Sequence, residues 1–176
     1  MKLLIHNSSN HLQTDNTQHQ FLAMLQQNSG ILHKVCRMYA NAEEDRKDLF
    51  QEIVAQLWKA FPAFRQESKI STWIYRIALN TAIAGYRKEQ RRISTVTIDA
   101  DLLQQEERDD LAKVERLKMM YRAISQLTDI EKALVMLYIE DKSYEEMEDI
   151  LGMTQGNLRV KMNRIKEKLR KQVSEE

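Results

Sequence analysis

Glycine and proline are scarce in this chain of 176 residues, which contains four glycines and one proline. Both residues mark tight turns and irregular loops, so their scarcity leaves little material for a protein built from many short strands. Leu, Ile, Met, Lys and Glu are abundant instead, and these residues tolerate helices well. The composition therefore predicts an all-α fold, and the length suits one domain or two small ones.

A single cysteine, Cys36, excludes a disulfide framework and fits a reducing cytoplasm. His33 and Cys36 have the spacing of metal ligands, but no second Cys/His pair completes a tetrahedral site. We expect a half-buried histidine beside a core cysteine, and neither a metal site nor a cofactor.

Long apolar runs are also missing, since none approaches the ~20 residues that a membrane helix needs. The opening Met1–Ile5 is too short for the apolar core of a signal peptide. We therefore expect a cytoplasmic protein that does not insert into membranes.

Residues 143–173 contain two apolar stripes at helical spacing, separated by a short break. In the break, Gly152 suits the left-handed turn that closes a helix, and Thr154 suits the N-cap of the next helix. Two amphipathic helices joined by a glycine-containing turn form the helix-turn-helix pattern. The stripes consist of Tyr144, Met147, Ile150 and Leu151, then of Leu158, Met162, Ile165 and Leu169.

Charge separates these two helices, although the net charge of the whole chain is only +1. The first helix carries acids and no base, whereas the second is strongly basic. Opposite its apolar stripe, the second helix places Val160, Asn163 and Glu167, flanked by Arg159 and Arg164. Arg and Asn can read base edges in the major groove. We interpret this helix as a DNA-reading element; the alternative is a solvated basic helix in an ordinary bundle.

Residues 46–60 form a predicted helix with one broad apolar face, which Phe61-Pro62 ends. Asp48, Gln51 and Glu52 lie on the opposite face. This acidic face is either simply solvated or a docking surface for a basic partner, and the stretch alone does not decide between these readings.

Aromatic side chains alternate with basic ones between residues 64 and 92, over a loop and a helix from about Ile70 to Arg87. Single-stranded DNA is bound by such surfaces, because bases stack on aromatic rings and cations contact phosphates. The alternative is that several of these aromatics, Trp73 among them, belong to the core. The candidate residues are Phe64, Arg65, Trp73, Arg76, Asn80 and Arg87.

The chain divides into four parts on this pattern. The polar composition of residues 1–18 predicts a tail. The apolar pattern of residues 19–92 predicts a first helical domain, with a break near Asn28-Ser29-Gly30. Residues 93–113 are acidic and predict a flexible linker. Residues 114–176 predict a second domain of about four helices, with a capping box at Thr128–Glu131. We therefore expect two small helical domains, the second ending in the helix-turn-helix.

Three stretches, in this order, resemble the extracytoplasmic-function (ECF) subfamily of the sigma-70 family of bacterial RNA polymerase sigma factors. DLFQEIVAQLW (Asp48–Trp58) looks like region 2.2, which binds the clamp helices of the polymerase β′ subunit. FRQESKISTWIYRIALNTAIAGYRK (Phe64–Lys88) looks like regions 2.3 and 2.4, which open and read the minus-ten promoter element. SYEEMEDILGMTQGNLRVKMNRIKEKLR (Ser143–Arg170) looks like region 4.2, which reads the minus-thirty-five element.

The resemblance implies an alternative sigma factor that directs core polymerase to promoters and has no catalytic activity of its own. Its implied partners are core RNA polymerase, through the β′ clamp helices and the β flap, and promoter DNA, both double- and single-stranded. An anti-sigma factor is a further partner to consider. Asp48, Gln51 and Glu52 would bind polymerase. Independently of the resemblance, the basic second helix of residues 143–173 predicts that Lys161 and Lys166 contact phosphates. The implied minus-thirty-five contacts are Thr154, Gln155, Asn157, Arg159, Val160, Lys161, Asn163 and Arg164.

The chain departs from the family pattern at several positions. Val160 and Asn163 differ from the common choices, so a promoter sequence cannot be transferred. The family usually has Ala where Met147 or Glu148 stands, and a hydroxyl where Asn157 stands. The alternative function is that of a stand-alone helix-turn-helix regulator, which would usually bind a palindrome as a dimer.

Overall fold

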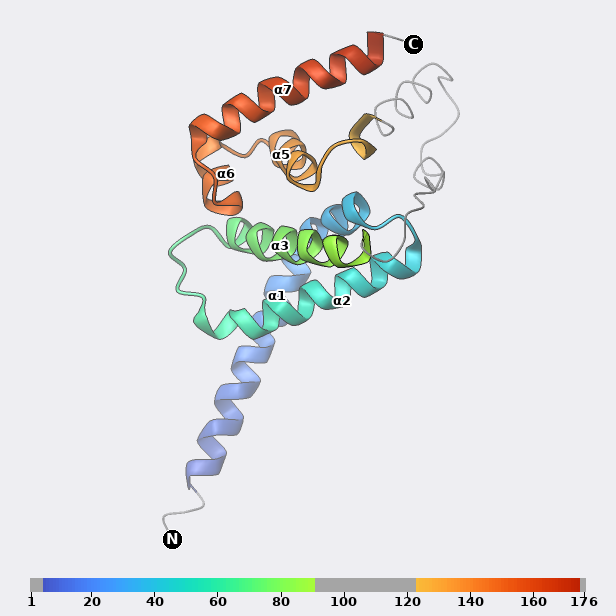
Figure 1. Cartoon of the computed structure of the whole chain (residues 1–176). Helices are drawn as coiled ribbons and strands as arrows, with labels where there is room; N and C mark the ends of the chain where they lie inside the picture. Colours follow the sequence, from blue (N-terminus) through green and yellow to red (C-terminus); the bar gives the residue numbers. More distant parts are fainter. Residues whose placement is uncertain (1–4, 91–122, 175–176) are drawn as a thin grey trace, which may run out of the picture.

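Helices make up all the regular structure in the part of the chain that the computed structural model describes, residues 5–90 and 123–174 (Figure 1). The predicted all-α class is therefore confirmed. The proposed linker, residues 93–113, lies outside the described residues, as do residues 114–122. The elements are α1 (Ile5–Tyr39), α2 (Glu43–Ala60), the 3-10 turn η1 (Phe61–Ala63), α3 (Ile70–Gln90), α5 (Asp129–Ile139), α6 (Tyr144–Leu151) and α7 (Gln155–Ser174).

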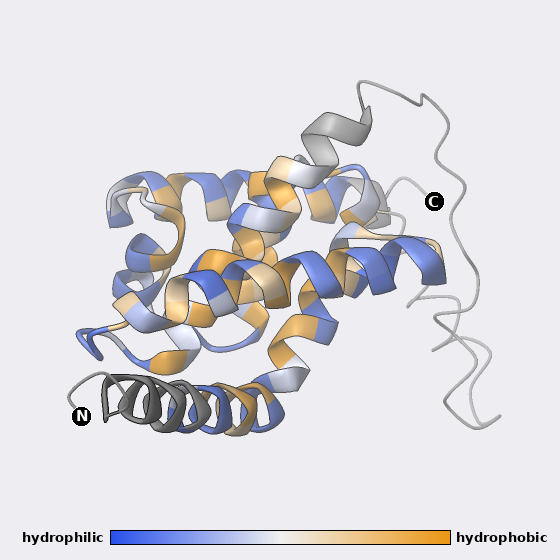
Figure 2. Cartoon of the chain, turned by 90° about the horizontal axis from the view of Figure 1, so that it is seen from below, coloured by the Kyte–Doolittle hydropathy of each residue, from blue (hydrophilic) through white to orange (hydrophobic). Residues whose placement is uncertain are grey.

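The first half of the chain is a bundle of α1, α2 and α3, each packed against the other two. Hydrophobic and hydrophilic residues alternate along these helices, so each turns one apolar face inward (Figure 2). Helix α2 ends at Ala60, as the Phe61-Pro62 pair predicted, and the chain continues as η1. The bundle core includes the fully buried residues Leu32, Val35, Ile53, Leu57, Ile74 and Leu79.

Helix α1 is longer than the sequence predicted. We expected a polar tail to residue 18 and a break near residue 29, but α1 is continuous from Ile5 to Tyr39, and its N-terminal part extends away from the bundle (Figure 1). The polar side chains at the expected break bond back to the helix: Asn28 Nδ2 donates to the Met24 carbonyl (2.9 Å) and Ser29 Oγ to that of Gln26 (3.3 Å). Gly30, in the middle of the helix, costs ~1 kcal/mol of helix stability, and the burial of apolar residues before and after it offsets this cost.

Two capping boxes fix the helix starts in the second half. Thr128 and Glu131 form the predicted box, in which the Thr128 amide donates to Glu131 Oε2 at 2.8 Å. Ser143 and Glu146 form a second box, with the Ser143 amide 3.0 Å from Glu146 Oε2. The sequence analysis missed the second box, although the Ser-x-x-Glu spacing is present in the chain.

The predicted helix-turn-helix is present as α6, a short turn and α7. Gly152 closes α6 with φ +66° and donates its N–H to the Glu148 carbonyl at 2.8 Å. The Thr154 carbonyl then accepts the Leu158 N–H at 3.0 Å, which places Thr154 at the start of α7, as predicted. Leu158, Met162 and Ile165 form the buried stripe of α7.

The two halves lie against each other. Helix α3 contacts α5 and α6 in addition to α1 and α2, so buried residues of both halves belong to one continuous apolar cluster. Each predicted half is therefore a helical bundle, and the described structure brings the two bundles into contact.

We predict opposite effects of alanine at two glycines of the helix-turn-helix. Gly152→Ala should reduce the free energy of unfolding by about 1–2 kcal/mol, because a side chain is disfavoured at φ +66°. Gly156→Ala, within α7, has open space around the new Cβ and should raise it by up to ~1 kcal/mol. Urea denaturation followed by circular dichroism measures both. Equal stabilisation by the two substitutions would contradict the left-handed turn.

Candidate nucleic-acid interface

The outer face of α7 is open to solvent. Arg159, Asn163 and Arg164 are exposed, and Val160 between them is 51% exposed. An exposed guanidinium can bridge O6 and N7 of guanine, an exposed amide can read adenine, and a valine can contact a thymine methyl group. The remaining candidates on this helix and its turn are also accessible: Thr154 and Asn157 are exposed, and Gln155 and Lys161 are half-buried.

The cations of α7 divide into two groups. Lys166 Nζ donates to the Tyr138 hydroxyl at 2.9 Å and lies 4.2 Å from the centre of that ring. Lys168 Nζ donates to the Gln126 carbonyl at 3.1 Å. These two lysines hold α7 against the preceding helices, so the structure gives Lys166 a different neighbour from the phosphate that the sequence suggested. Arg159 contacts the protein and is also open to solvent. Its guanidinium lies 4.5 Å from the Tyr144 ring centre, and the residue is exposed.

A second candidate surface lies at the loop before α3 and along that helix. The rings of Phe64 and Trp73 lie 4.8 Å apart, and both residues are half-buried. Trp73 also packs against the core, as the alternative interpretation expected, and its contact with DNA stays a prediction. Arg65 and Asn80 are exposed, whereas Arg87 lies in α3 with its side chain outside the described set.

Helix α6 covers part of this second surface. Arg76 Nε donates to the main-chain carbonyl of Asp149 at 2.6 Å. Lys69 Nζ lies 3.0 Å from Glu146 Oε1. Two cations of the α3 surface are thus already engaged by the acidic first helix of the helix-turn-helix.

Helix α2 presents a third surface. Asp48, Gln51 and Glu52 are all exposed, as their helical spacing predicted. Beside them, a groove of about 400 Å³ opens between α1 and α2. The sequence analysis did not predict this groove, and Trp58, which lines it, is 40% exposed. The groove is lined by Gln18, Phe21, Leu22, Phe50, Gln51, Val54, Ala55 and Trp58.

His33 and Cys36, which have the spacing of metal ligands, lie in different environments. Cys36 is buried, as predicted, and burial raises the pKa of its thiol to about 11. His33 was expected to be half-buried, but it is exposed and stacks on the Phe50 ring at 5.0 Å. Across the described residues, no three His, Cys, Asp or Glu side chains gather as a metal site would need.

None of the described helices is both long enough and apolar enough to span a membrane.

Comparison with known proteins identifies the family of this chain. The family profile for Sigma-70 region 2 matches residues 24–92, and the profile for Sigma-70, region 4 matches residues 117–169. The chain belongs to the sigma-70 family of sigma factors. It is thus an alternative sigma factor that directs transcription initiation, with core RNA polymerase and promoter DNA as its partners. Sigma factors are non-catalytic initiation factors.

Two relatives illustrate the similarity of this sigma factor to others. The ECF RNA polymerase sigma-E factor of Escherichia coli (strain K12) is 28% identical over 149 residues, which cover 77% of this chain and 78% of the relative. The RNA polymerase sigma-H factor of Pseudomonas aeruginosa is 28% identical over 162 residues, 85% of this chain and 83% of the relative.

Two solved structures share the fold. CnrH, in complex with the cytosolic domain of CnrY, superposes with a TM-score of 0.66 at 19% identity, covering 90% of each chain. The sigma factor RpoE of Bartonella quintana, in complex with the anti-sigma factor NepR, gives the same TM-score and identity over 90% of this chain and 97% of that one.

The second capping box should make the sigma factor sensitive to acid. Hydrogen bonds from the Ser143 amide and then from Lys69 lower the pKa of Glu146. Its contribution to stability is therefore fully present above the unfolded-state pKa, about 4.3, and is lost as the pH falls through the lowered folded-state value.

Glu146→Gln keeps a capping-box acceptor and removes the charge. We expect it to lower the melting temperature near pH 7, and we expect the gap to the unsubstituted chain to shrink near pH 3. Thermal unfolding at both pH values measures the gap. Glu145→Gln, on the exposed neighbour outside the box, is the control; an equal, pH-independent gap for both variants would contradict the role of Glu146.

Proposed function

We propose that this sigma factor has three binding surfaces, each with a separate function. The acidic face of α2 binds the polymerase clamp, the loop and helix α3 capture the melted minus-ten strand, and the outer face of α7 reads the minus-thirty-five duplex. The observation that carries the proposal is the separation of charge. An acidic face, an aromatic and basic surface, and a basic face with an amide lie on different helices of one chain.

The α7 surface supports duplex reading. Its base-reading candidates are exposed on one face, whereas the apolar stripe that holds the helix in place is on the other. The start of α7 also presents backbone N–H groups that can take a phosphate. Asn163 and Arg164 at the middle of the face would contact bases, and Lys161 would contact phosphate.

The α3 surface supports strand capture. Phe64 and Trp73 form a half-buried aromatic pair, and Asn80 is exposed on the same helix as Trp73. An unstacked base that enters a pocket beside Asn80 and the 64–72 loop would offset an unpairing cost of a few kcal/mol. Arg65, Arg76 and Arg87 would hold the phosphates of that strand.

The α2 surface supports a protein partner, because exposed carboxylates repel DNA phosphates. Asp48 and Glu52 match the basic side of such a partner, and the adjacent groove can receive an apolar side chain. By family resemblance, that partner is the pair of β′ clamp helices, and the β flap would contact the α5–α7 half.

Regulation by an anti-sigma factor and a cytoplasmic location complete the proposal. CnrH was solved with the cytosolic domain of CnrY, and RpoE with an anti-sigma factor. The shared fold supports a similar partner here. Core polymerase acts in the cytoplasm, where the free thiol of Cys36 would remain reduced.

The α2 surface provides the decisive test. Asp48→Arg with Glu52→Arg should abolish co-purification with core polymerase and promoter-specific transcription, because loss of paired interface charges costs about 2–5 kcal/mol. Folding and affinity of the free protein for DNA should change little. The control, Glu43→Arg with Glu145→Arg, makes the same change in charge at exposed acids, since Glu43 lies on a different side of α2 and Glu145 lies in α6. If the test variant still supports transcription and the wild type binds its promoter as a dimer without polymerase, the chain is a stand-alone regulator.

The α7 surface predicts a sequence-dependent effect. Arg164→Ala should weaken binding to the preferred minus-thirty-five duplex by ~1–3 kcal/mol and binding to scrambled DNA by less. Lys171→Ala, an exposed cation near the end of the same helix, should weaken both by a similar small amount. Fluorescence anisotropy at fixed salt measures the affinities. Equal losses on both duplexes for Arg164→Ala would make this arginine a backbone contact.

A further inference from the structure

We infer that Tyr144 is a positioning residue of the minus-thirty-five surface. Its ring, at the start of α6, holds the guanidinium of Arg159 on α7 in place for reading a base, so Tyr144 sets a sequence preference without touching DNA. The inference rests on the proposed function, because it takes Arg159 as a base contact. It adds to that function a residue outside the DNA-reading helix, together with the intramolecular contact through which this residue acts.

The contact joins the two helices of the helix-turn-helix. Arg159, in the second turn of α7, places its Cζ atom 4.5 Å from the centre of the Tyr144 ring. A cation is attracted to the face of an aromatic ring within about 6 Å of its centre. Among the described residues, no carboxylate pairs with the Arg159 guanidinium and no side-chain hydrogen bond holds it. The ring is therefore the group that restrains this side chain.

The Tyr144 ring is itself held in place. The capping box fixes the backbone around Tyr144, since Ser143 Oγ accepts the Glu146 N–H at 3.1 Å and the Ser143 N–H donates to Glu146 Oε2 at 3.0 Å. The side chain is half-buried and packs against the apolar core. A ring that is fixed at its backbone and packed against a core has few rotamers left, so it is a rigid support for a long arginine side chain.

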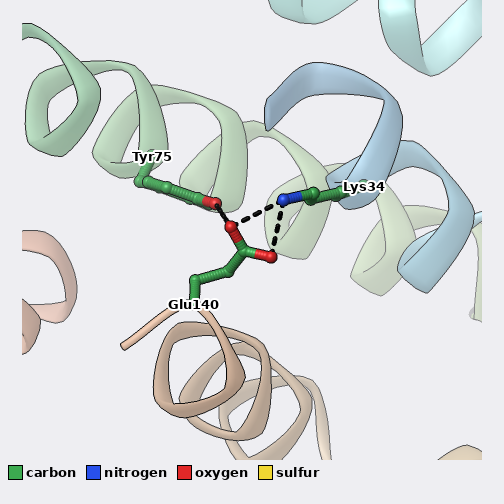
Figure 3. A network of polar contacts seen from close by, with 3 residues as sticks. All are labelled: Lys34, Tyr75 and Glu140. Atoms are coloured by element: carbon green, nitrogen blue, oxygen red, sulfur yellow. Dashed lines mark hydrogen bonds and ion pairs between the residues drawn. The ribbon is translucent and has the colours of Figure 1, made fainter. Parts of the chain in front are cut away.

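A ring restrains a cation without occupying its hydrogen-bond donors. Lys34 shows the contrast in Figure 3, because its Nζ donates to both carboxylate oxygens of Glu140 at 2.6 Å. Lys166 likewise donates to the Tyr138 hydroxyl at 2.9 Å. Arg159 has no such acceptor among the described residues. Its N–H groups stay available for O6 and N7 of guanine, so the contact with the ring and a contact with a base are compatible.

Restraint of Arg159 favours base reading over phosphate binding. Asn163 follows Arg159 by one turn of helix, so the two exposed residues lie on the same side of α7. A free arginine side chain can turn to a phosphate, which carries no sequence information. A restrained side chain loses less rotamer freedom when its donors meet matching acceptors, and a wrong base leaves those donors unpaired. Tyr144 should therefore affect the choice of sequence more than the overall affinity for DNA.

Ring-current shifts test the contact in the free full-length chain. The side-chain protons of Arg159 should be shifted upfield in the NMR spectrum by the ring beneath them. Tyr144→Phe should keep this shift, and Tyr144→Leu should remove it. Tyr138→Leu is the matched control, because it removes the other ring that lies under a cation of α7. Arg159 resonances that are unchanged by Tyr144→Leu would overturn the inference.

Selection from a duplex library tests the effect on reading. The full-length chain is offered duplexes with about ten randomised base pairs, one turn of B-DNA, and the base preference at each position is measured. Arg159→Ala should abolish the preference at one position. Tyr144→Leu should lower the preference at that same position roughly two- to fivefold, as expected for an exposed cation–π contact, and leave the other positions unchanged. Tyr144→Phe should keep every preference.

A double-mutant cycle shows whether Tyr144 acts through Arg159. Affinities are measured by fluorescence anisotropy on the duplex that the wild-type chain selects and on the same duplex with that one base pair changed. Tyr144→Leu should lower the ratio of the two affinities no further once Arg159→Ala is present. With Arg164→Ala, the two reductions should multiply, because the described structure shows no contact between Arg164 and the ring. Multiplication with Arg159→Ala as well would contradict the positioning role.

Failure of the inference and failure of the proposed function give different results. If the wild-type chain enriches no sequence, or if Arg159→Ala leaves every preference intact, Arg159 is not a base contact and that part of the function fails with the inference. If Arg159→Ala removes a preference that Tyr144→Leu keeps, the function stands and the inference alone is wrong. If Tyr144→Phe weakens binding to all duplexes alike, the tyrosine hydroxyl contacts DNA directly, which also overturns the inference.

Discussion

Burial of the middle of α3 on two sides is the constraint on which the rest of the structure depends. Ile74 and Tyr75 are fully buried, and the small residues Ala78 and Ala82 let neighbouring helices approach closely. Helices α1 and α2 pack on one side of α3 while α5 and α6 pack on the other. A helix that is packed on two sides has little surface left for ligands. Its remaining polar residues carry the contacts between the halves and, in the function proposed above, would also carry the contacts with DNA.

The cations of the chain fall into two groups: some contact other parts of the protein, and others face solvent. Lys166 lies over Tyr138, and Lys168 bonds a main-chain carbonyl, so these cations stabilise the position of α7. Asn163 and Arg164 face solvent on the same helix. A count of positive charge overstates the surface available to nucleic acid, because part of that charge is used inside the protein. The same holds on α3, where Arg76 bonds a carbonyl of α6.

Local patterns in the sequence predicted what local physics determines. The glycine turn at Gly152, the Thr128 capping box and the outward face of α7 depend on residues within a few positions of one another, and the structure has all three. The continuous path of α1 through Ser29 was missed, because tertiary packing outweighs a weak local preference against helix. The carboxylate of Glu140 meets Lys34 across more than a hundred residues, and no periodicity in one sequence reveals such a pairing.

The two faces of α7 have a consequence for how this protein can change over generations. The residues that fix the helix, Leu158, Met162 and Ile165, are buried, whereas Val160 and Asn163 point away from every packing contact of that stripe. Replacing an exposed residue typically alters stability by less than about 0.5 kcal/mol. New binding preferences can therefore arise on the outer face by single substitutions without loss of the fold, so a duplicated copy of this chain could acquire a separate set of target genes while keeping the same scaffold.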